Sequence, residues 1–153
     1  MNIGDKIEFA LPNQNGEMIS SENYLNQGII IYVYPKDNTP GCTKEACSYR
    51  DNYQLLEAKG YKVFGLSKDS VKSHKNFEEK YSLPFTLLSD ENLTLIKELG
   101  SYQEKSLYGK KFMGVVRSTF IFDNNHQLVY QNFKVKAAED AVSTLKILEK
   151  LEK

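Results

Sequence analysis

The fold of this chain is decided by the stretch IIIYVYPKDNTPGCTKEAC at residues 29–47. Its first part, Ile29 to Tyr34, is an unbroken run of β-branched and aromatic residues, which is typical of a strand covered on both faces of a parallel or mixed sheet. The turn-forming residues 36–41, KDNTPG, come next, and a segment with apolar residues at helical spacing follows them. The stretch therefore predicts a central strand, a short connection, and a helix from about Pro40 to Lys59 that Gly60 closes.

Strand and helix patterns alternate along the remainder of the chain. They predict strands at Lys62–Ser67 and Phe85–Ser89, helices at Ser70–Tyr81 and Leu93–Leu99, a hairpin of Ser118–Phe122 with Leu128–Phe133, and a last helix from about Ala138. Before the central strand, the alternation in Lys6–Leu11, the turn residues that follow and the segment Glu17–Ser20 predict a short hairpin. Residues 101–116 show no clear period, and we expect a loop there.

Two of the predicted helices carry an apolar stripe that would face the sheet. The stripes are Ala46, Tyr49, Tyr53 and Leu56 in the first helix, and Ala138, Ala141, Leu145 and Leu148 in the last. This order of elements predicts the α/β class, with a mixed central β-sheet flanked by helices and an N-terminal β-hairpin. A length of 153 residues suits one hydrophobic core, so we expect a single domain over residues 1–153.

The composition disfavours several classes of function. Twenty Lys and Arg against twenty Asp and Glu give a formal net charge of zero, so no broad basic field is available for nucleic acid or for an anionic membrane. The longest apolar run, Ile29–Tyr34, is far shorter than the roughly 20 residues that span a bilayer. The N-terminus, MNIGDKIEFALP, lacks the basic and apolar regions of an export signal. We expect a cytoplasmic protein with no nucleic-acid partner and no membrane contact.

Cys42 falls at the start of the predicted helix, directly after the central strand. Thr39 is a plausible N-cap, and Pro40 suits the first helical position because its missing N–H costs nothing there. The free backbone N–H groups and the helix dipole of the first turn favour a thiolate over a thiol. The carboxyl end of a central strand is also where open α/β sheets usually place their sites. These features indicate a nucleophile, although a small buried core residue is the alternative at this stage.

The only other cysteine, Cys47, lies five residues further along the same helix. In an ideal helix this spacing separates the two Cα atoms by about 8–9 Å and turns them about 140° apart. A disulfide requires a Cα separation below about 7 Å. Cys42 and Cys47 therefore cannot bond while the helix is intact, but could do so if its first turns unwound. A packed core thiol is again the alternative.

Other cysteine chemistries fit the sequence poorly. A structural zinc site needs four ligands at short paired spacings, and only His74 and His126 could join the two cysteines. His74 lies on a polar helix and His126 in a hairpin turn, so we expect both to be solvated and no metal to be bound. A cysteine hydrolase would need one of them as a base beside Cys42, which nothing in the spacing supports. Residues 43–45 contain no cysteine, which excludes a Cys-x-x-Cys oxidoreductase.

The segment YPKDNTPGCTKEAC, residues 34–47, resembles the active-site segment of the peroxiredoxins, specifically of the bacterioferritin-comigratory or peroxiredoxin Q branch. The stretch YGKKFMGVVRSTF from Tyr108 to Phe120 resembles the same branch. The similarity, taken with the order of elements, covers nearly the whole chain. It implies a thioredoxin-like fold and the reduction of hydrogen peroxide or organic hydroperoxides, without a metal or an organic cofactor.

The resemblance also implies roles for particular residues. Cys42 would be the peroxidatic cysteine, which attacks a peroxide oxygen and becomes a sulfenic acid. Thr39 would orient the peroxide, Arg117 would stabilise the thiolate and the leaving oxygen, and Pro35 would shield the thiolate from water. Cys47 matches the resolving cysteine of those branch members that carry it five residues on, and its attack would give an intramolecular disulfide.

Thioredoxin, or a glutaredoxin-type donor, would then reduce that disulfide. Because the resolving cysteine is in the same chain, no partner subunit is needed, and a monomer or a weak homodimer is expected. Two further functions use the same cysteines and stay open at the level of sequence. One is a redox sensor or holdase with little turnover, and the other is a thiolate metal-binding module.

Overall fold

In the computed structural model, which describes residues 1–152, the central sheet is built around strand β3 (Gly28–Val33). Strand β4 (Tyr61–Ser67) pairs parallel with β3 on one side, and β8 (Ser118–Phe122) pairs antiparallel with it on the other. Strands β5 (Thr86–Ser89) and β9 (Leu128–Asn132) complete the order β5-β4-β3-β8-β9. The predicted α/β class and mixed sheet are confirmed.

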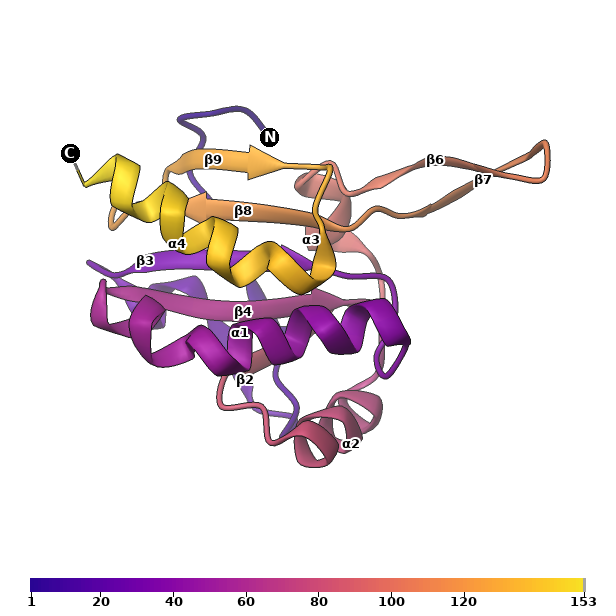
Figure 1. Ribbon diagram of the computed structural model, residues 1–153, viewed down its shortest axis with the longest axis horizontal. Coiled ribbons are helices and arrows are strands. Elements are labelled where there is room, and N and C mark those ends of the chain that lie inside the picture. Colours follow the sequence, from indigo (N-terminus) through magenta and orange to yellow (C-terminus); the bar gives the residue numbers. More distant parts are fainter. Residues whose placement is uncertain (153) are drawn as a thin grey trace.

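Both faces of this sheet are covered (Figure 1). Helices α1 (Pro40–Ala58) and α4 (Asp140–Leu151) lie side by side over one face. Helix α3 (Thr94–Glu98) and the N-terminal segment cover the other, and α2 (Val71–Tyr81) packs at the β5 edge. Every side chain of β3 is consequently buried, which is why its sequence shows no alternation of polar and apolar residues.

The start of α1 is held against the sheet by aromatic stacking. Tyr49 stacks on Tyr32 of β3 with ring centroids 4.5 Å apart and an interplanar angle of 10°, a contact worth about 0.5–1.5 kcal/mol beyond simple burial. Gly65 in β4 leaves room for this pair, because a Cβ there would lie 2.9 Å from the Tyr32 hydroxyl oxygen. The stacking fixes the helix over the carboxyl end of β3, where Cys42 lies.

The N-terminal hairpin is present but shorter than predicted. Strand β1 (Ala10–Pro12) pairs with β2 (Met18–Ser20), and a 3₁₀ turn at Ser21–Tyr24 follows. Ile7 and Phe9, which suggested an earlier strand start, are buried in the core beneath the sheet. Their alternation reflects an extended segment that packs in the core and pairs with the start of β9 through an isolated bridge between Lys6 and Gln127, before β1 begins.

The prediction of a loop over residues 101–116 is wrong. Strands β6 (Tyr102–Leu107) and β7 (Lys110–Val115) form a hairpin that projects from the body of the protein (Figure 1). Most of its side chains are exposed, and Tyr108 at its tip is 96% exposed. Because neither face of the hairpin is buried against the core, its sequence has no alternation that would reveal the strands.

The last helix begins slightly later than its apolar pattern suggested. A 3₁₀ turn spans Ala137–Glu139, and Ala138 is exposed rather than part of the buried stripe. Ala141 and Leu148 of α4 are buried as predicted, and Leu145 is half-buried. Among residues 1–152, no helix is both long and apolar enough to cross a membrane.

Candidate active site

Cys42 lies in the first turn of α1, as the sequence predicts. Thr39 has the extended backbone of an N-cap, and its carbonyl accepts the first helical hydrogen bond, from the Thr43 N–H at 2.8 Å. The Thr39 side chain does not cap the helix, because its hydroxyl donates to the Lys36 carbonyl at 2.9 Å. Pro40 occupies the start of the helix, and Cys42 is only 1% exposed. The thiol is therefore buried in the first turn of the helix, where backbone N–H groups and the helix dipole favour negative charge.

Arg117 comes to Cys42 from the short connection between β7 and β8. One guanidinium nitrogen, Nη2, donates to Cys42 Sγ at 3.3 Å, and the other, Nη1, donates to Glu45 Oε1 at 2.6 Å. Gly41 permits this approach, because a Cβ there would lie 3.1 Å from Nη2. A planar fork that holds two acceptors at once fixes its own orientation, so the positive charge is aimed at the sulfur.

The positive charge of Arg117 and the negative charge on Glu45 and Cys42 stabilise each other. Burial lowers the pKa of Arg117, but the neighbouring Glu45 carboxylate and Cys42 sulfur outweigh that effect, and its pKa is raised. A permanent cation 3.3 Å from the sulfur stabilises negative charge there. The arrangement can stabilise a thiolate and, beside it, an oxygen that gains negative charge during a displacement.

Glu45 was not predicted from the sequence. It lies one helical turn after Cys42, and its side chain is fully buried. Burial raises the pKa of its carboxyl well above the usual value of 4.5, the nearby Asp140 raises it further, and Arg117 acts in the opposite direction. A glutamate in a polar stretch of helix normally faces solvent, so only the tertiary structure reveals this one.

Asp140 at the start of α4 extends the polar network behind Glu45. Its carboxylate accepts hydrogen bonds from the Tyr49 hydroxyl at 2.8 Å and from the Thr119 hydroxyl at 2.8 and 3.0 Å. Burial raises the pKa of Asp140, and the hydrogen bonds that it accepts act against this. We call the set Glu45, Tyr49, Arg117, Thr119 and Asp140 the acid cluster. It connects β8, α1 and α4 to the side chain that contacts Cys42.

The remaining predicted residues lie around the same helix start. Pro35 is half-buried at the beginning of the connection from β3, and Thr39 is half-buried at its end. Cys47 lies in the second turn of α1, is partly exposed, and is a free thiol like Cys42. The intact helix keeps the two cysteines apart, as the spacing predicted.

Comparisons with known proteins agree on one family. Residues 3–131 match the AhpC/TSA family model. The chain is 48% identical to a putative peroxiredoxin Bcp of Coxiella burnetii, over 79% of this chain and 81% of the relative. It is 37% identical to peroxiredoxin Bcp of Bacillus subtilis, over 95% and 94%.

This chain belongs to the AhpC/TSA family, in its peroxiredoxin Bcp/Q branch. Solved structures agree: a PrxQ variant of Xylella fastidiosa superposes with a TM-score of 0.94 at 33% identity, covering 100% of this chain and 98% of that one. The bacterioferritin comigratory protein of Xanthomonas campestris gives 0.89 at 35% identity, covering 95% and 92%. The resemblance to this branch and the thioredoxin-like fold are thereby confirmed, and the protein is a thiol peroxidase.

Both histidines of this peroxiredoxin differ from the expectation that they are solvated. His74 on α2 is fully buried, and His126 is 3% exposed. The ring nitrogen Nε2 of His126 lies 2.9 Å from the Tyr24 carbonyl oxygen, within hydrogen-bond distance. The polar neighbours of His74 in the sequence concealed its burial, because the helix stripe gave no reason to place an imidazole against the sheet.

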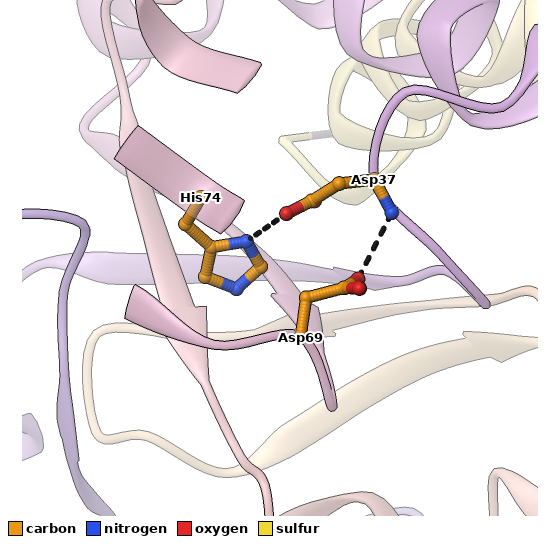
Figure 2. Close-up of side chains that lie close together, drawn as sticks. All are labelled: Asp37, Asp69 and His74. Carbon is orange, nitrogen blue, oxygen red and sulfur yellow. Dashed lines mark hydrogen bonds and ion pairs between the residues drawn. The ribbon is translucent and has the colours of Figure 1, made fainter. Parts of the chain in front are cut away.

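His74 forms a cluster with Asp37 and Asp69, whose potential ligand atoms lie within 4.8 Å of one another (Figure 2). Protein groups already occupy these atoms. His74 Nδ1 contacts Asp37 Oδ2 at 2.7 Å, His74 Nε2 contacts the Leu88 carbonyl at 2.9 Å, and Asp69 Oδ2 accepts from the Asp37 backbone N–H at 2.9 Å. The cluster is therefore built as a hydrogen-bond network within the peroxiredoxin, and its ligand atoms are not arranged around a cation.

Proposed function

We propose that Cys42 is the residue through which this peroxiredoxin reduces peroxides. The thiolate attacks the terminal oxygen of a hydroperoxide, an S–O bond forms, the O–O bond breaks, and the electron pair leaves with the alkoxide or hydroxide. A proton then gives the alcohol or water. The 3.3 Å contact between Arg117 Nη2 and Cys42 Sγ carries the proposal, because it places a fixed cation beside the thiolate sulfur and the leaving oxygen, the two atoms that bear negative charge. Thr39 would orient the peroxide, and Pro35 would keep water from the thiolate.

Cys47 completes the proposal as the resolving cysteine. Its sulfur would attack the Cys42 sulfenic acid, forming an S–S bond and releasing water. The first turns of α1 must unwind for the sulfurs to meet. Contacts beyond Ser48 favour a boundary there: the Tyr49 hydroxyl donates to Asp140 at 2.8 Å, and Arg50 Nη1 donates to the Tyr81 carbonyl at 2.9 Å. Unwinding would thus involve residues 40–48 while the rest of the helix stays in place.

Two thiols of a thioredoxin, or of a glutaredoxin-type donor, would reduce the disulfide and become oxidised in turn. Hydrogen peroxide and organic hydroperoxides are the proposed substrates, and the alkyl peroxide reduction activity of the Xanthomonas campestris relative supports the second group. We include a monomer or weak homodimer and a cytoplasmic location in the proposal. Bacterial relatives support the location, although one plant relative is chloroplastic.

Mass spectrometry after one equivalent of peroxide tests the assignment of both cysteines. The peptide that spans Cys42 and Cys47 should lose two hydrogens in the wild type. In Cys47→Ser, a sulfenic acid on Cys42 should become trappable. A disulfide between two chains through Cys42 in the wild type would contradict the role of Cys47. An oxidised crystal structure with a Cys42–Cys47 bond and an intact helix would contradict the unwinding step.

Sustained turnover separates the enzyme from a sensor or holdase. Peroxide-dependent oxidation of thioredoxin should continue over many cycles and should disappear in Cys42→Ser. A single stoichiometric oxidation without turnover would favour the sensor. Elemental analysis of the purified protein addresses the metal-binding module, which requires bound metal at the two thiolates.

A further inference from the structure

The connection between β3 and α1 carries Pro35 and Thr39, and Asp37 lies at its centre. Although its neighbours Lys36 and Asn38 are exposed, Asp37 is only 6% exposed. The carboxyl group of Asp37 bonds to side chains of α2, and its backbone N–H bonds to Asp69 just after β4. A single inward-facing residue thus ties the whole connection to the neighbouring layer.

Four hydrogen bonds hold Asp37 there. Oδ1 accepts from the Tyr34 hydroxyl at 2.5 Å, and Oδ2 accepts from the Ser73 hydroxyl at 2.8 Å and shares a 2.7 Å hydrogen bond with His74 Nδ1. The backbone N–H donates to Asp69 Oδ2 (Figure 2). The same oxygen also accepts from the Ser67 hydroxyl. We call Tyr34, Asp37, Ser67, Asp69, Ser73 and His74 the loop clamp. It joins the connection to β4 and α2.

His74 is held through both ring nitrogens. The Leu88 carbonyl can only accept, so Nε2 at 2.9 Å must carry a hydrogen. The hydrogen bond between Nδ1 and Asp37 Oδ2 is 2.7 Å long, and the Tyr34 and Ser73 hydroxyls donate to the same carboxyl group. His74 and Asp37 therefore form a buried hydrogen-bonded pair, and removal of either side chain would leave a buried polar group without its partner.

The clamp bears directly on Thr39. The Thr39 hydroxyl is held by the carbonyl of Lys36, which immediately precedes Asp37. Between them, Asn38 adopts a left-handed φ of 61°, a conformation that asparagine takes more readily than most non-glycine residues and that forms the turn between Asp37 and Thr39. A shift of Asp37 would move the Lys36 carbonyl and release the turn at Asn38. The Thr39 hydroxyl would then lose its place three residues before Cys42.

We propose that Asp37 and His74 are positioning residues for the peroxide reaction, because their buried pair fixes the turn that places Thr39 beside Cys42. The inference rests on the proposed roles of Cys42 and Thr39. It assigns a function to a cluster that makes no side-chain hydrogen bond to either cysteine within residues 1–152. It also explains why a polar helix buries an imidazole at the end of the sheet.

The test compares two reactions of Cys42 in reduced protein. Oxidation by hydrogen peroxide, followed by stopped flow, depends on Thr39, whereas alkylation by iodoacetamide depends only on the thiolate and its access. Since misplacing a reacting group by about 1 Å can cost up to about 100-fold, we expect Asp37→Ala and His74→Gln each to slow peroxide oxidation about tenfold. Alkylation should change by less than about twofold.

A double-mutant cycle shows whether the effect passes through Thr39. In a Thr39→Val background, Asp37→Ala should slow oxidation by less than about threefold, because the hydroxyl that the clamp positions is already gone. Asp37→Asn keeps the shape of the side chain and replaces Asp37→Ala in both measurements if that variant does not fold. Ile96→Val, a core change in α3 far from the connection, is the control for lost stability and should leave both reactions unchanged.

Three results would overturn the inference: an unchanged peroxide rate in the folded Asp37 variants, an equal slowing in both backgrounds, or a parallel loss of alkylation. Failure of the proposed function looks different. In that case the wild-type protein itself would not consume peroxide through Cys42, whatever residue stands at position 37.

Discussion

The acid cluster and the loop clamp are both buried and polar, and both support the start of α1, but they differ in how completely their atoms are paired. In the clamp, the Asp37 carboxylate and both nitrogens of His74 have hydrogen-bond partners. On the other side, Glu45 Oε2 and the nearby Tyr32 hydroxyl have none within residues 1–152. The acid cluster also places two carboxyls and the Cys42 sulfur around one cation, Arg117.

This difference matches what each region has to do. A fully paired cluster is rigid and suits a connection that must keep one conformation. A cluster with two buried carboxyls and one cation holds the pKa of both carboxyls above their usual range. It is also easier to rearrange, because its present arrangement leaves polar atoms unsatisfied. The acid cluster includes Glu45, which lies in the segment proposed to unwind. The clamp holds residues that precede this segment and need not move with it.

The largest expected effect comes from removing the cation of the acid cluster. Arg117→Met should lower the rate constant for oxidation of Cys42 by peroxide by about 100-fold to 1,000-fold, because the charge on the leaving oxygen loses its fixed partner. Stopped-flow measurement of Cys42 oxidation checks this. Lys111→Met on the exposed β6–β7 hairpin is the matched loss of a cation and should have no effect. A rate constant for Cys42 oxidation in Arg117→Met equal to that of the wild type would show that Arg117 does not stabilise the leaving oxygen.

Removal of Asp140 should cost stability without removing the Cys42 contact. Asp140→Ala leaves the Tyr49 and Thr119 hydroxyls without their shared acceptor, and we expect the free energy of unfolding to fall by about 2 kcal/mol. Urea denaturation measures it. Glu139→Ala, the exposed neighbour, is the control and should change stability little. Equal losses in the two variants would mean that the buried hydrogen bonds contribute nothing.

Glu45 makes the two clusters distinguishable by pH. Its pKa is raised in the folded protein, mainly by burial, so the folded state holds a proton that the unfolded state loses above about pH 4.5. The free energy of unfolding should therefore decrease as pH rises from this value towards the folded pKa. Glu45→Gln removes the titration, so its stability should increase relative to that of the wild type from pH 5 to pH 8.

Denaturant unfolding at several pH values measures this difference. Glu57→Gln, a partly exposed glutamate further along α1, should follow the wild-type profile. Parallel profiles for wild type and Glu45→Gln would show that Glu45 does not hold the proton.

The smallest expected effects on stability come from removing one of two buried tyrosine hydroxyls, that of Tyr34, which has a hydrogen-bond partner, or that of Tyr32, which has none within residues 1–152. Tyr34→Phe removes a hydroxyl that donates to Asp37 and should cost about 1 kcal/mol of stability. Tyr32→Phe removes a buried hydroxyl that lacks a partner in the described chain and should be neutral or stabilise by up to about 1 kcal/mol. Thermal unfolding of both variants, side by side, measures the contrast. Equal destabilisation would contradict the distinction between the clusters.

Regular patterns of burial were readable from the sequence. The run Ile29–Tyr34 was predicted as a strand because it is buried on both faces and is therefore continuously apolar, and the helix after Pro40 because its buried residues recur at helical spacing. The strand Ser118–Phe122 was predicted from the hairpin signal that follows it. The hairpin of residues 102–115 was missed because it buries neither face. Ala138 was placed in the wrong environment because a 3₁₀ turn there changes the direction of the chain before α4 begins.

The candidate site divides in the same way. Cys42, Cys47 and Thr39 lie within one stretch of sequence, so local rules for helix starts and helical spacing sufficed to single them out. Pro35 lies in the same stretch but was singled out only by family resemblance. Arg117 was added by family resemblance, since its contact with Cys42 joins residues 75 positions apart. Glu45, Asp140 and His74 were not recognised, because polar residues in polar surroundings look solvated until the chain is folded.

The sequence by itself determined the central strand, the helix start with its cysteine, and the need to unwind that helix before Cys47 can reach Cys42. These follow from backbone geometry within a few residues. Only the tertiary structure decided which charges surround the sulfur and what holds the connection before it. Those depend on side chains from α2, α4 and the β7–β8 connection that meet at the carboxyl end of β3. Electrostatic interactions and hydrogen bonds act over a few ångströms in space, and the periodicity of the sequence does not predict which distant residues become neighbours.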